Sequence, residues 1–521
     1  MSTTKATIKH AAIYSSAAML GRVVGFIMLP FYAHALRGHG YAVIGMVDVG
    51  LGLLLSLLVY GLQGSIVRLY HDEADPARKP VVVSTGIISI GVVTALISIP
   101  LVVFARPIAA LLIDDADLGH LIILALLSFN LDMMGQAASS WLLIRSRSAL
   151  MAGLSLLRLI IGLSLNIYLI LLKDMGLDGY FIASLVVNLV SCLVFVSIAF
   201  HDCGRKFDRD IARRIRDFLS PLIPGSFASW ISRQVEVVLA KTQISLESVG
   251  IMEMGYKFPL LITVLLIEPF MRSWDTRRYE IADEPGAPQV IARMFTYFTF
   301  FMLWLGLMMA VAIKPVLEIL TPPEFHIAYR IARLEIVTVI LQGAYFFLVF
   351  GLAYAKDTAT ISKLRIGTSI FKVGLSWLFI TTWGILGAAF SATITGLVST
   401  ALIFHYSQKR YHLQLEWKPL ALMISVSCGI FLWLTNYDFT SAGAYHLLDK
   451  QFLPWIQEGL EPTFLGGWKD GKLINLLNKN AHLITDIIIQ GTLAMCFIIV
   501  LPIVHTPTRQ KWTRKIRSKL A

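Results

Sequence analysis

Apolar residues in this chain gather into long stretches, and a short polar or charged segment separates each stretch from the next. A helix needs ~20 largely apolar residues to cross the hydrocarbon core of a bilayer. Stretches of that length occur at 10–33, 42–63, 81–104, 118–143, 151–172, 180–200, 218–240, 249–270, 293–313, 331–354, 364–383, 386–406, 419–436 and 484–505. The pattern predicts an all-α integral membrane protein of about fourteen transmembrane helices.

The basic residues of the connecting segments predict the orientation of these spans. Lys and Arg are enriched by about three to one on the side that holds both chain ends, which is typical of the cytoplasmic side of a membrane protein. We therefore expect both termini to be cytoplasmic. The segment 437–483 then becomes an outer connection between the last two spans.

Composition supports this interpretation. Hydrophobic residues make up 56% of the 521 residues and charged residues only 15%, and the mean hydropathy is +0.70. These values exclude an ordinary soluble enzyme. The formal net charge of +12 mostly reflects the sorting of basic residues to one side of the membrane, so we do not expect nucleic acid as a partner.

The order of the spans predicts two six-helix lobes followed by two further helices. The N-lobe covers 1–217 and the C-lobe 218–417, while 418–521 holds the last two spans, the outer segment and a basic cytoplasmic tail. The seventh span resembles the first, with GSFASWISRQVE in one and SSAAMLGRVVG in the other, each with an arginine deep in the helix. Such pseudo-repeats are common in transporters, whose substrate path lies between the halves.

Two basic segments have the spacing of amphipathic helices. Apolar residues recur at helical spacing among cationic ones in 204–219, and every fourth residue in the tail. These residues are Phe207, Ile211, Ile215 and Phe218 in the first segment, and Trp512, Ile516 and Leu520 in the second. Helices of this kind lie on membrane surfaces rich in anionic lipid. Anionic inner-leaflet lipids are therefore expected partners, and binding of a protein partner is the alternative.

Arg22 is the clearest ionisable residue inside a predicted span. A charge at mid-bilayer costs roughly 3 kcal/mol on insertion scales unless it faces protein or water, so the chain must enclose a polar interior, as a carrier does. Gly21 and Gly25 allow a second helix to approach closely. A guanidinium matches phosphate oxygens with two parallel hydrogen bonds, which favours an anionic cargo. The alternative is a structural arginine paired with Asp48 or Asp132.

Two further cations lie deep in predicted spans beside acidic residues. Arg233 in the seventh span has Glu236 three residues later, and Lys257 in the eighth has Glu253 four residues earlier. Residues at these spacings share a helix face, so each pair is either a local ion pair or part of a ligand site.

The remaining buried charges allow two roles. Arg158 lies close enough to the cytoplasmic end of its span to reach the surface, but Gly162 and Asn166 extend its polar stripe, so Arg158 is also a candidate for substrate binding in a cationic cavity. Lys372 has a similar depth. Asp132 lies in the middle of the fourth span, and Asp48 in the second. Each of these two acids is either a protonation site for ion coupling or a counter-ion for an arginine.

Enzyme chemistry has little support in the sequence. A glycine-rich phosphate loop, an HExxH motif and a metal-ligand cluster are all missing from it, so no cofactor or metal is expected. His446 and His482 are isolated in the outer segment. That segment also contains no arginine, whereas a membrane polymerase would be expected to place clustered charged residues there.

Several segments of the chain occur together in an order that is typical of one family. The first is GRVVGFIMLPFYAHALRGHGYAVIGMVDVG, followed by GLQGSIVRLYHDE. PLIPGSFASWISRQVEVVLAKTQISLESVGIMEMGYKF opens the second half, and KPVLEILTPPEFHIAYRIARLE and GILGAAFSATITGLVS follow. These segments resemble the polysaccharide transporter family, the Wzx-type flippases of the MATE-like multidrug, oligosaccharidyl-lipid and polysaccharide superfamily. The resemblance covers about residues 10–410, and the order of the pieces is its most specific feature.

This resemblance implies a V-shaped, two-lobed bundle that alternates between inward- and outward-open states. It implies a polyprenyl-pyrophosphate-linked oligosaccharide as cargo, flipped across the bacterial cytoplasmic membrane for surface polysaccharide assembly, with glycan assembly proteins as further partners. Relatives bind the anionic head group in a cationic cavity, to which Arg22, Arg233 and Lys257 correspond here. Two departures are Ala42, where a glycine is usual, and the long segment 437–483.

Three other functions remain open at this point. A cation-coupled multidrug antiporter of the same superfamily would use carboxylates to face cationic drugs, and Asp48, Asp132 and Glu236 would be the candidates. A membrane polysaccharide polymerase or ligase would act on the same glycans, and a non-transporting scaffold would need no site. The nature of the glycan and of the coupling ion does not follow from the residues.

Overall fold

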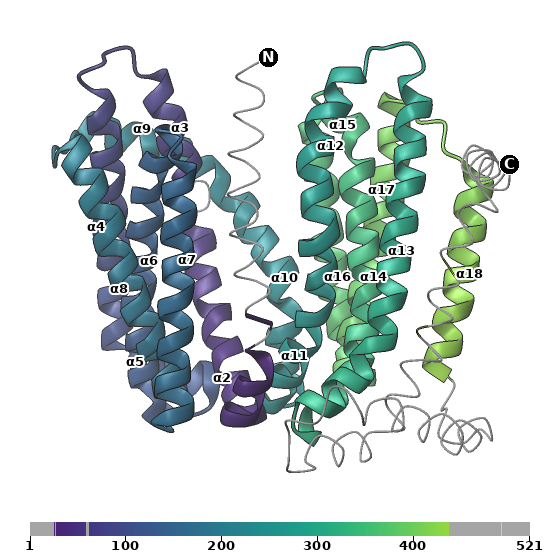
Figure 1. The fold of residues 1–521 in the computed structure, drawn as a ribbon, viewed down its shortest axis with the longest axis horizontal. Coiled ribbons are helices and arrows are strands. Elements are labelled where there is room, and N and C mark those ends of the chain that lie inside the picture. The colour runs from purple at the N-terminus through teal and green to yellow at the C-terminus, as the bar shows by residue number, and fades with distance from the viewer. Residues whose placement is uncertain (1–24, 27, 59–61, 437–490, 492–496, 498–521) are drawn as a thin grey trace, which may run out of the picture. The chain divides into compact units, whose positions relative to one another are not determined.

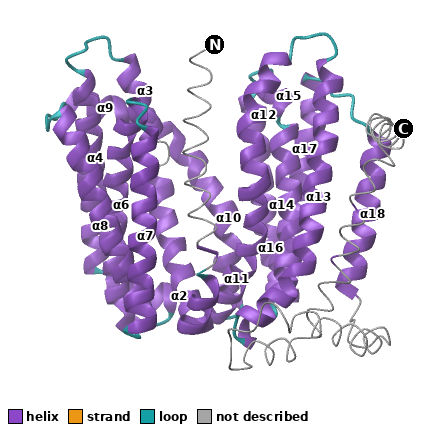
Figure 2. Cartoon of the chain, viewed as in Figure 1, coloured by secondary structure: helices purple, strands orange, loops and turns teal. Residues whose placement is uncertain are grey.

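The described part of the chain is helical throughout. The computed structural model describes residues 25–26, 28–58, 62–436, 491 and 497. Within these residues helices alternate with loops and no strand is formed (Figures 1 and 2). The predicted all-α class is thus confirmed. A helix satisfies its backbone hydrogen bonds within one segment, which is what a bilayer demands of a spanning chain.

The first ten helices run from α2 to α11. They are α2 (Leu29–Leu58), α3 (Leu62–Asp72), α4 (Lys79–Val103), α5 (Ala105–Ile113), α6 (Gly119–Ile144), α7 (Ser148–Asn166), α8 (Gly176–Cys203), α9 (Arg209–Leu219), α10 (Ile223–Gln243) and α11 (Leu246–Ile262). The backbone leaves the helical region at Arg37, with φ 58° and ψ −175°, so Leu29–Leu58 is two helices joined at a kink. This kink falls in the segment that separates the first two predicted spans.

The second series runs from α12 to α18. Its members are α12 (Glu268–Ile281), α13 (Ala287–Leu320), α14 (Ala328–Leu348), α15 (Phe350–Tyr354), α16 (Thr358–Trp383), α17 (Ile385–Arg410) and α18 (Trp417–Asn436). Two π-helical turns, η2 (Ile167–Leu172) and η4 (Thr263–Ile267), continue α7 and α11. The turn η4 joins α11 to α12, so the eighth predicted span is one helical segment that reaches Ile281.

Eleven helical segments in the described residues are long and apolar enough to cross a membrane. Each corresponds to a predicted span. The seventh predicted span, 218–240, forms α10 but is not among the eleven, because Arg233, Gln234 and Glu236 lower its hydropathy. The spans 10–33 and 484–505 fall largely outside the described residues, as do both termini. The count of fourteen and the position of the termini therefore stay predictions.

The helices form two compact units. Unit 1 comprises 1–254 and 365–391, and unit 2 comprises 255–364 and 392–521. The helices α11, α16 and α17 contribute residues to both units. The described helices of unit 1 are α2 to α10 with parts of these three, and those of unit 2 are α12 to α15 and α18 with the other parts (Figure 1).

Unit 1 has a core beneath the amphipathic helix α9. Asp208 caps this helix: its carboxylate accepts hydrogen bonds from the amides of Asp210 (2.8 Å) and Ile211 (3.3 Å). Ile211 and Ile215 pack into a buried cluster with Ile66 and other residues of α3, α4, α6 and α8. The helical spacing predicted for this segment is confirmed. The two isoleucines contact protein, however, while Arg209, Arg213 and Arg216 stay exposed.

Unit 2 is built around stacked aromatic residues. The rings of Phe270 and Phe298 stack with centroids 4.4 Å apart, and Phe347 packs against both. Near this cluster Arg278 is only 5% exposed and donates to the carbonyl oxygens of Phe346 and Phe347, each at 3.3 Å. Ring stacking and burial of this kind hold α12, α13 and α14 together.

Candidate functional site: polar groups within the spans

Arg158 lies in a polar network that joins α6, α7 and α8. Its Nη2 atom donates to Oδ1 of Asp132 at 2.8 Å and to Oδ1 of Asn188 at 2.6 Å. Gln136 donates to the second oxygen of Asp132 at 2.7 Å, and Asn188 donates to Ser128 Oγ at 2.8 Å. Every polar group facing Arg158 is thus itself hydrogen-bonded, which makes the arrangement rigid.

The same network leaves part of Arg158 available. The side chain is 40% exposed, and its Nε and Nη1 atoms make no hydrogen bond within the described residues. A guanidinium has five donors in a planar fork, so the two bonds of Nη2 leave three for a ligand. Asp132 is 21% exposed and acts as the counter-ion of Arg158, one of the two roles that the sequence allows for it.

Glu236 lies in a second network, between α10, α16 and α17. Lys372 Nζ lies 3.1 Å from Oε2 of Glu236, and the two side chains are 13% and 4% exposed. Ser391 Oγ donates to Oε1 of Glu236 at 3.1 Å and lies 2.9 Å from Ser376 Oγ. Both carboxylate oxygens therefore have partners. A buried ion pair needs this kind of additional hydrogen bonding to offset its desolvation cost.

This network corrects one alternative from the sequence. A local ion pair between Arg233 and Glu236 is not formed. Glu236 is buried against α16 and α17, whereas the side chain of Arg233 is exposed and makes no hydrogen bond or ion pair within the described part of the chain. Arg233 is therefore an exposed cation on α10.

The helix that carries Arg233 packs on α2, where Asp48 lies. Trp230 donates to the carbonyl oxygen of Val49 at 3.2 Å, and Ser226 Oγ donates to the carbonyl oxygen of Ser56 at 2.8 Å. Asp48 is exposed on α2. These bonds show that α10, which carries Arg233, packs against α2, which carries Asp48.

Arg22 and Lys257 are the other two predicted site residues. Arg22 lies outside the described residues. Lys257 is half-buried in α11, within unit 2, two residues before Pro259 and ahead of the π-helical turn η4. Such turns are frequent at functional sites because they redirect side chains along a helix.

Sequence reasoning missed the partners of the buried charges. Asn188, Ser391 and Ser376 complete the two networks, and Lys372 is the partner of Glu236. The available signal was a polar residue near the middle of each of three apolar spans. No group of three His, Cys, Asp or Glu side chains that could hold a metal ion occurs in the described residues.

Comparison with solved structures identifies the fold. The chain is similar in fold to the lipid II flippase MurJ in an inward closed conformation, with a TM-score of 0.66 and 15% identity over 94% of this chain and 98% of that one. It is also similar to an inward-facing multidrug resistance MATE transporter (TM-score 0.55, 16% identity, 75% of this chain and 98% of that one). A third similar structure is a MOP-superfamily transporter from Pyrococcus furiosus, with a TM-score of 0.53 and 15% identity over 77% of this chain and 95% of that one.

These likenesses define a multi-pass membrane protein with the MurJ and MATE fold. Residues 7–274 match the model of the family described as polysaccharide biosynthesis protein, and the chain belongs to that family. A comparison with curated protein sequences finds no match. The predicted resemblance to the polysaccharide transporters of this superfamily is therefore confirmed.

Proposed function

We propose that this protein is a flippase that moves a polyprenyl-pyrophosphate-linked oligosaccharide across the bacterial cytoplasmic membrane. The cargo would be made on the cytoplasmic face and used outside for surface polysaccharide assembly. Transport would proceed by alternating access of the two predicted six-helix lobes, 1–217 and 218–417. Glycan assembly proteins would supply and remove the cargo.

One observation carries this proposal. A chain of the polysaccharide biosynthesis protein family has, over nearly its whole length, the fold of a protein that flips a lipid. The exposed guanidinium of Arg233 and the three open donors of Arg158 add support. Cations of this kind suit a pyrophosphate, because guanidinium groups bind phosphate oxygens through charge-assisted hydrogen bonds. Arg22 and Lys257 complete the proposed cationic cavity.

The carboxylates argue against a multidrug antiporter as the first choice. A site for cationic drugs needs acidic groups that are open to the drug. Asp132 and Glu236 are instead bonded to Arg158 and Lys372. Asp48 lies on the exposed side of α2. The antiporter is kept as the alternative outcome of the experiment.

The test is the sidedness of the lipid-linked oligosaccharide in cells that lack the protein, probed with an impermeant glycosidase or sugar-oxidising reagent. A flippase predicts intermediate that accumulates protected on the cytoplasmic face. Accumulation on the outer face would instead indicate a polymerase or ligase, and absence of accumulation would favour the antiporter.

Complementation of these cells with variants tests whether transport depends on the proposed site residues. Arg233→Ala should reproduce the accumulation without loss of protein from the membrane, since this side chain is exposed and bonds to no described residue. Arg205→Ala is the matched control, because Arg205 is also exposed but follows α8 outside the spans. Equal export by both variants would remove Arg233 from the proposed cavity.

A further inference from the structure

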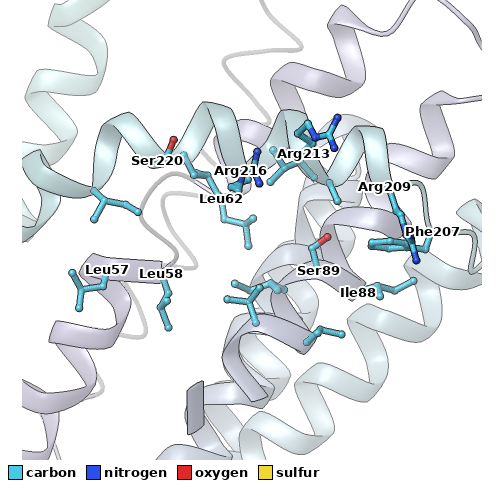
Figure 3. A pocket seen from close by; sticks show the side chains of 17 residues that line it. Leu57, Leu58, Leu62, Ile88, Ser89, Phe207, Arg209, Arg213, Arg216 and Ser220 are labelled. Carbon is cyan, nitrogen blue, oxygen red and sulfur yellow. The ribbon is translucent and has the colours of Figure 1, made fainter. Parts of the chain in front are cut away.

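A cavity of about 690 Å³ lies between α9, the end of α2 and the middle of α4 in unit 1 (Figure 3). Its floor is apolar, with Leu57 and Leu58 from α2 and Ile88, Val92 and Val93 from α4. Arginine side chains of α9 form the opposite wall. The cavity therefore has one apolar side at the depth of the spans and one cationic side at the predicted cytoplasmic surface.

The apolar floor continues along α4. Val92 is 52% exposed, and Leu96, Ile99 and Val103 follow on the same side of the helix, at 62%, 60% and 72%. An apolar stripe on a spanning helix that no described residue covers is suited to contact with an acyl chain. The cavity thus opens onto a path that a lipid chain can follow.

The cationic wall consists of Arg209, Arg213 and Arg216 (Figure 3). Arg209 and Arg213 are exposed and form no ion pair within the described residues. Arg216 contacts Asp217 at 2.9 Å, and both of these side chains are largely exposed, so the pair is weak. Guanidinium groups left open in this way attract phosphate.

The wall of the cavity is held in place from the protein side. Arg78 Nη2 lies 2.7 Å from a carboxylate oxygen of Asp208, and Arg214 Nη1 lies 2.7 Å from one of Glu73. These pairs tie α9 to the loop between α3 and α4. The arginines that line the cavity are different ones, so they are presented on a helix that is already anchored.

We propose that this cavity binds one anionic glycerophospholipid of the inner leaflet. Arg209, Arg213 and Arg216 would hold its phosphate, and one acyl chain would lie on Leu58, Ile88 and Val92 and continue along α4. The site is separate from the proposed cargo cations Arg158 and Arg233, which do not line it. Its occupant would also contact Ile223, the first residue of the helix that carries Arg233.

The test measures lipid binding to the purified full-length protein by native mass spectrometry, with phosphatidylglycerol and phosphatidylcholine of identical chains. Phosphatidylglycerol should bind about tenfold more tightly, because each basic residue near a membrane surface favours anionic lipid. Arg209→Gln/Arg213→Gln should abolish that preference. Arg205→Gln/Lys206→Gln, which removes the same charge just outside the cavity, should keep it.

A second variant tests the apolar floor. Val92→Trp should weaken the binding of phosphatidylglycerol although all arginines remain, and the exposed position of Val92 allows the larger ring without disturbing the core. Equal binding of both lipids, or equal loss in the two charge variants, would overturn the proposal. So would competition in which polyprenyl phosphate displaces phosphatidylglycerol from this cavity, because the occupant would then be cargo. Melting temperatures of all variants exclude misfolding as the cause.

Discussion

Lys372 Nζ lies 3.1 Å from a carboxylate oxygen of Glu236, and this ion pair is buried between α10 and α16. Ser391 from α17 bonds to the other oxygen of Glu236. Residues of unit 1 from three helices therefore meet at one carboxylate whose two oxygens both have partners. Since the hydrocarbon core cannot solvate either charge, each side chain stays charged only because the other compensates its charge.

The first prediction concerns the energy of this pair. Lys372→Met should lower the apparent melting temperature in detergent strongly, because breaking a buried pair on one side costs about 3–5 kcal/mol. Glu236→Gln/Lys372→Met should be markedly more stable than Lys372→Met, since it leaves no lone charge. Lys363→Met on the same helix is the control, because Lys363 is exposed. Additive effects in this double-mutant cycle would show that the pair is not coupled.

The second prediction separates Arg158 from its counter-ion. Asp132→Asn should change stability by about 1 kcal/mol or less, since the pair is partly exposed. Arg158→Gln should weaken binding of a pyrophosphate-bearing lipid about tenfold, the loss expected for a charge-assisted hydrogen bond. Asp132→Asn should not weaken it, because the cation remains. Titration of the lipid into protein in nanodiscs measures this, and equal losses would make Arg158 a purely structural residue.

The third prediction tests a close helix contact. A methyl group on Gly250 of α11 would clash with the carbonyl oxygen of Gly38 and would lie 3.2 Å from the amide nitrogen of Ala42. Small residues allow membrane helices to approach in this way. Gly250→Ala should therefore destabilise the protein by about 1–3 kcal/mol. Thermal unfolding in detergent is the measurement.

The control for that variant is Gly225→Ala. A methyl group on Gly225 would have no neighbour within 4 Å, and alanine favours a helix over glycine. Its melting temperature should stay unchanged or rise slightly. A fall equal to that of Gly250→Ala would mean that the contact between α11 and α2 is not the cause.

The fourth prediction concerns pH and the anchoring of α9. The Arg78 guanidinium, by hydrogen bonding to Asp208, holds the pKa of that carboxyl below its ordinary value, and Arg214 does the same to the pKa of Glu73. A depressed carboxyl pKa contributes stability above the unfolded value of about 4, and that stability is lost as the pH falls through the folded values.

Hydrogen exchange of the α9 amides, corrected for intrinsic rates, measures this dependence. Protection should be constant from about pH 5 to 9 and decline only in more acidic solution. Arg78→Gln/Arg214→Gln should lower protection at neutral pH and remove most of the acid dependence. A decline between about pH 6 and 7 would contradict this assignment and indicate a histidine instead.

The spans were predictable because each is a property of a local stretch of chain. Twenty consecutive apolar residues in a bilayer have few alternatives to a helix, and eleven of the predicted spans correspond to described helices. The seventh shows the limit of that argument. Its polar residues reduce its hydropathy, yet α10 forms, because Trp230 and Ser226 bond to α2 and Glu236 bonds to α16 and α17.

The charged residues of the candidate site were predictable from the sequence, but the residues with which they pair were not. Charges inside apolar spans identify Arg158, Arg233 and Glu236 from sequence alone. The spacing of Arg233 and Glu236 suggested a pair, but one side chain faces outward and the other is buried against α16. Whether a helix face is buried or exposed depends on which other helix packs against it. That helix is distant in the chain, so the local sequence does not reveal it.

The amino-acid pattern alone is enough to predict an integral membrane protein, the approximate places of its spans and the presence of charge within them, because these follow from the cost of exposing polar groups to hydrocarbon. The folded arrangement was needed to show that Lys372 neutralises Glu236, that Asp132 and Asn188 bond to Arg158, and that the arginines of α9 line an apolar cavity. Those outcomes depend on contacts between helices far apart in the chain, and a local pattern carries no information about which helices meet.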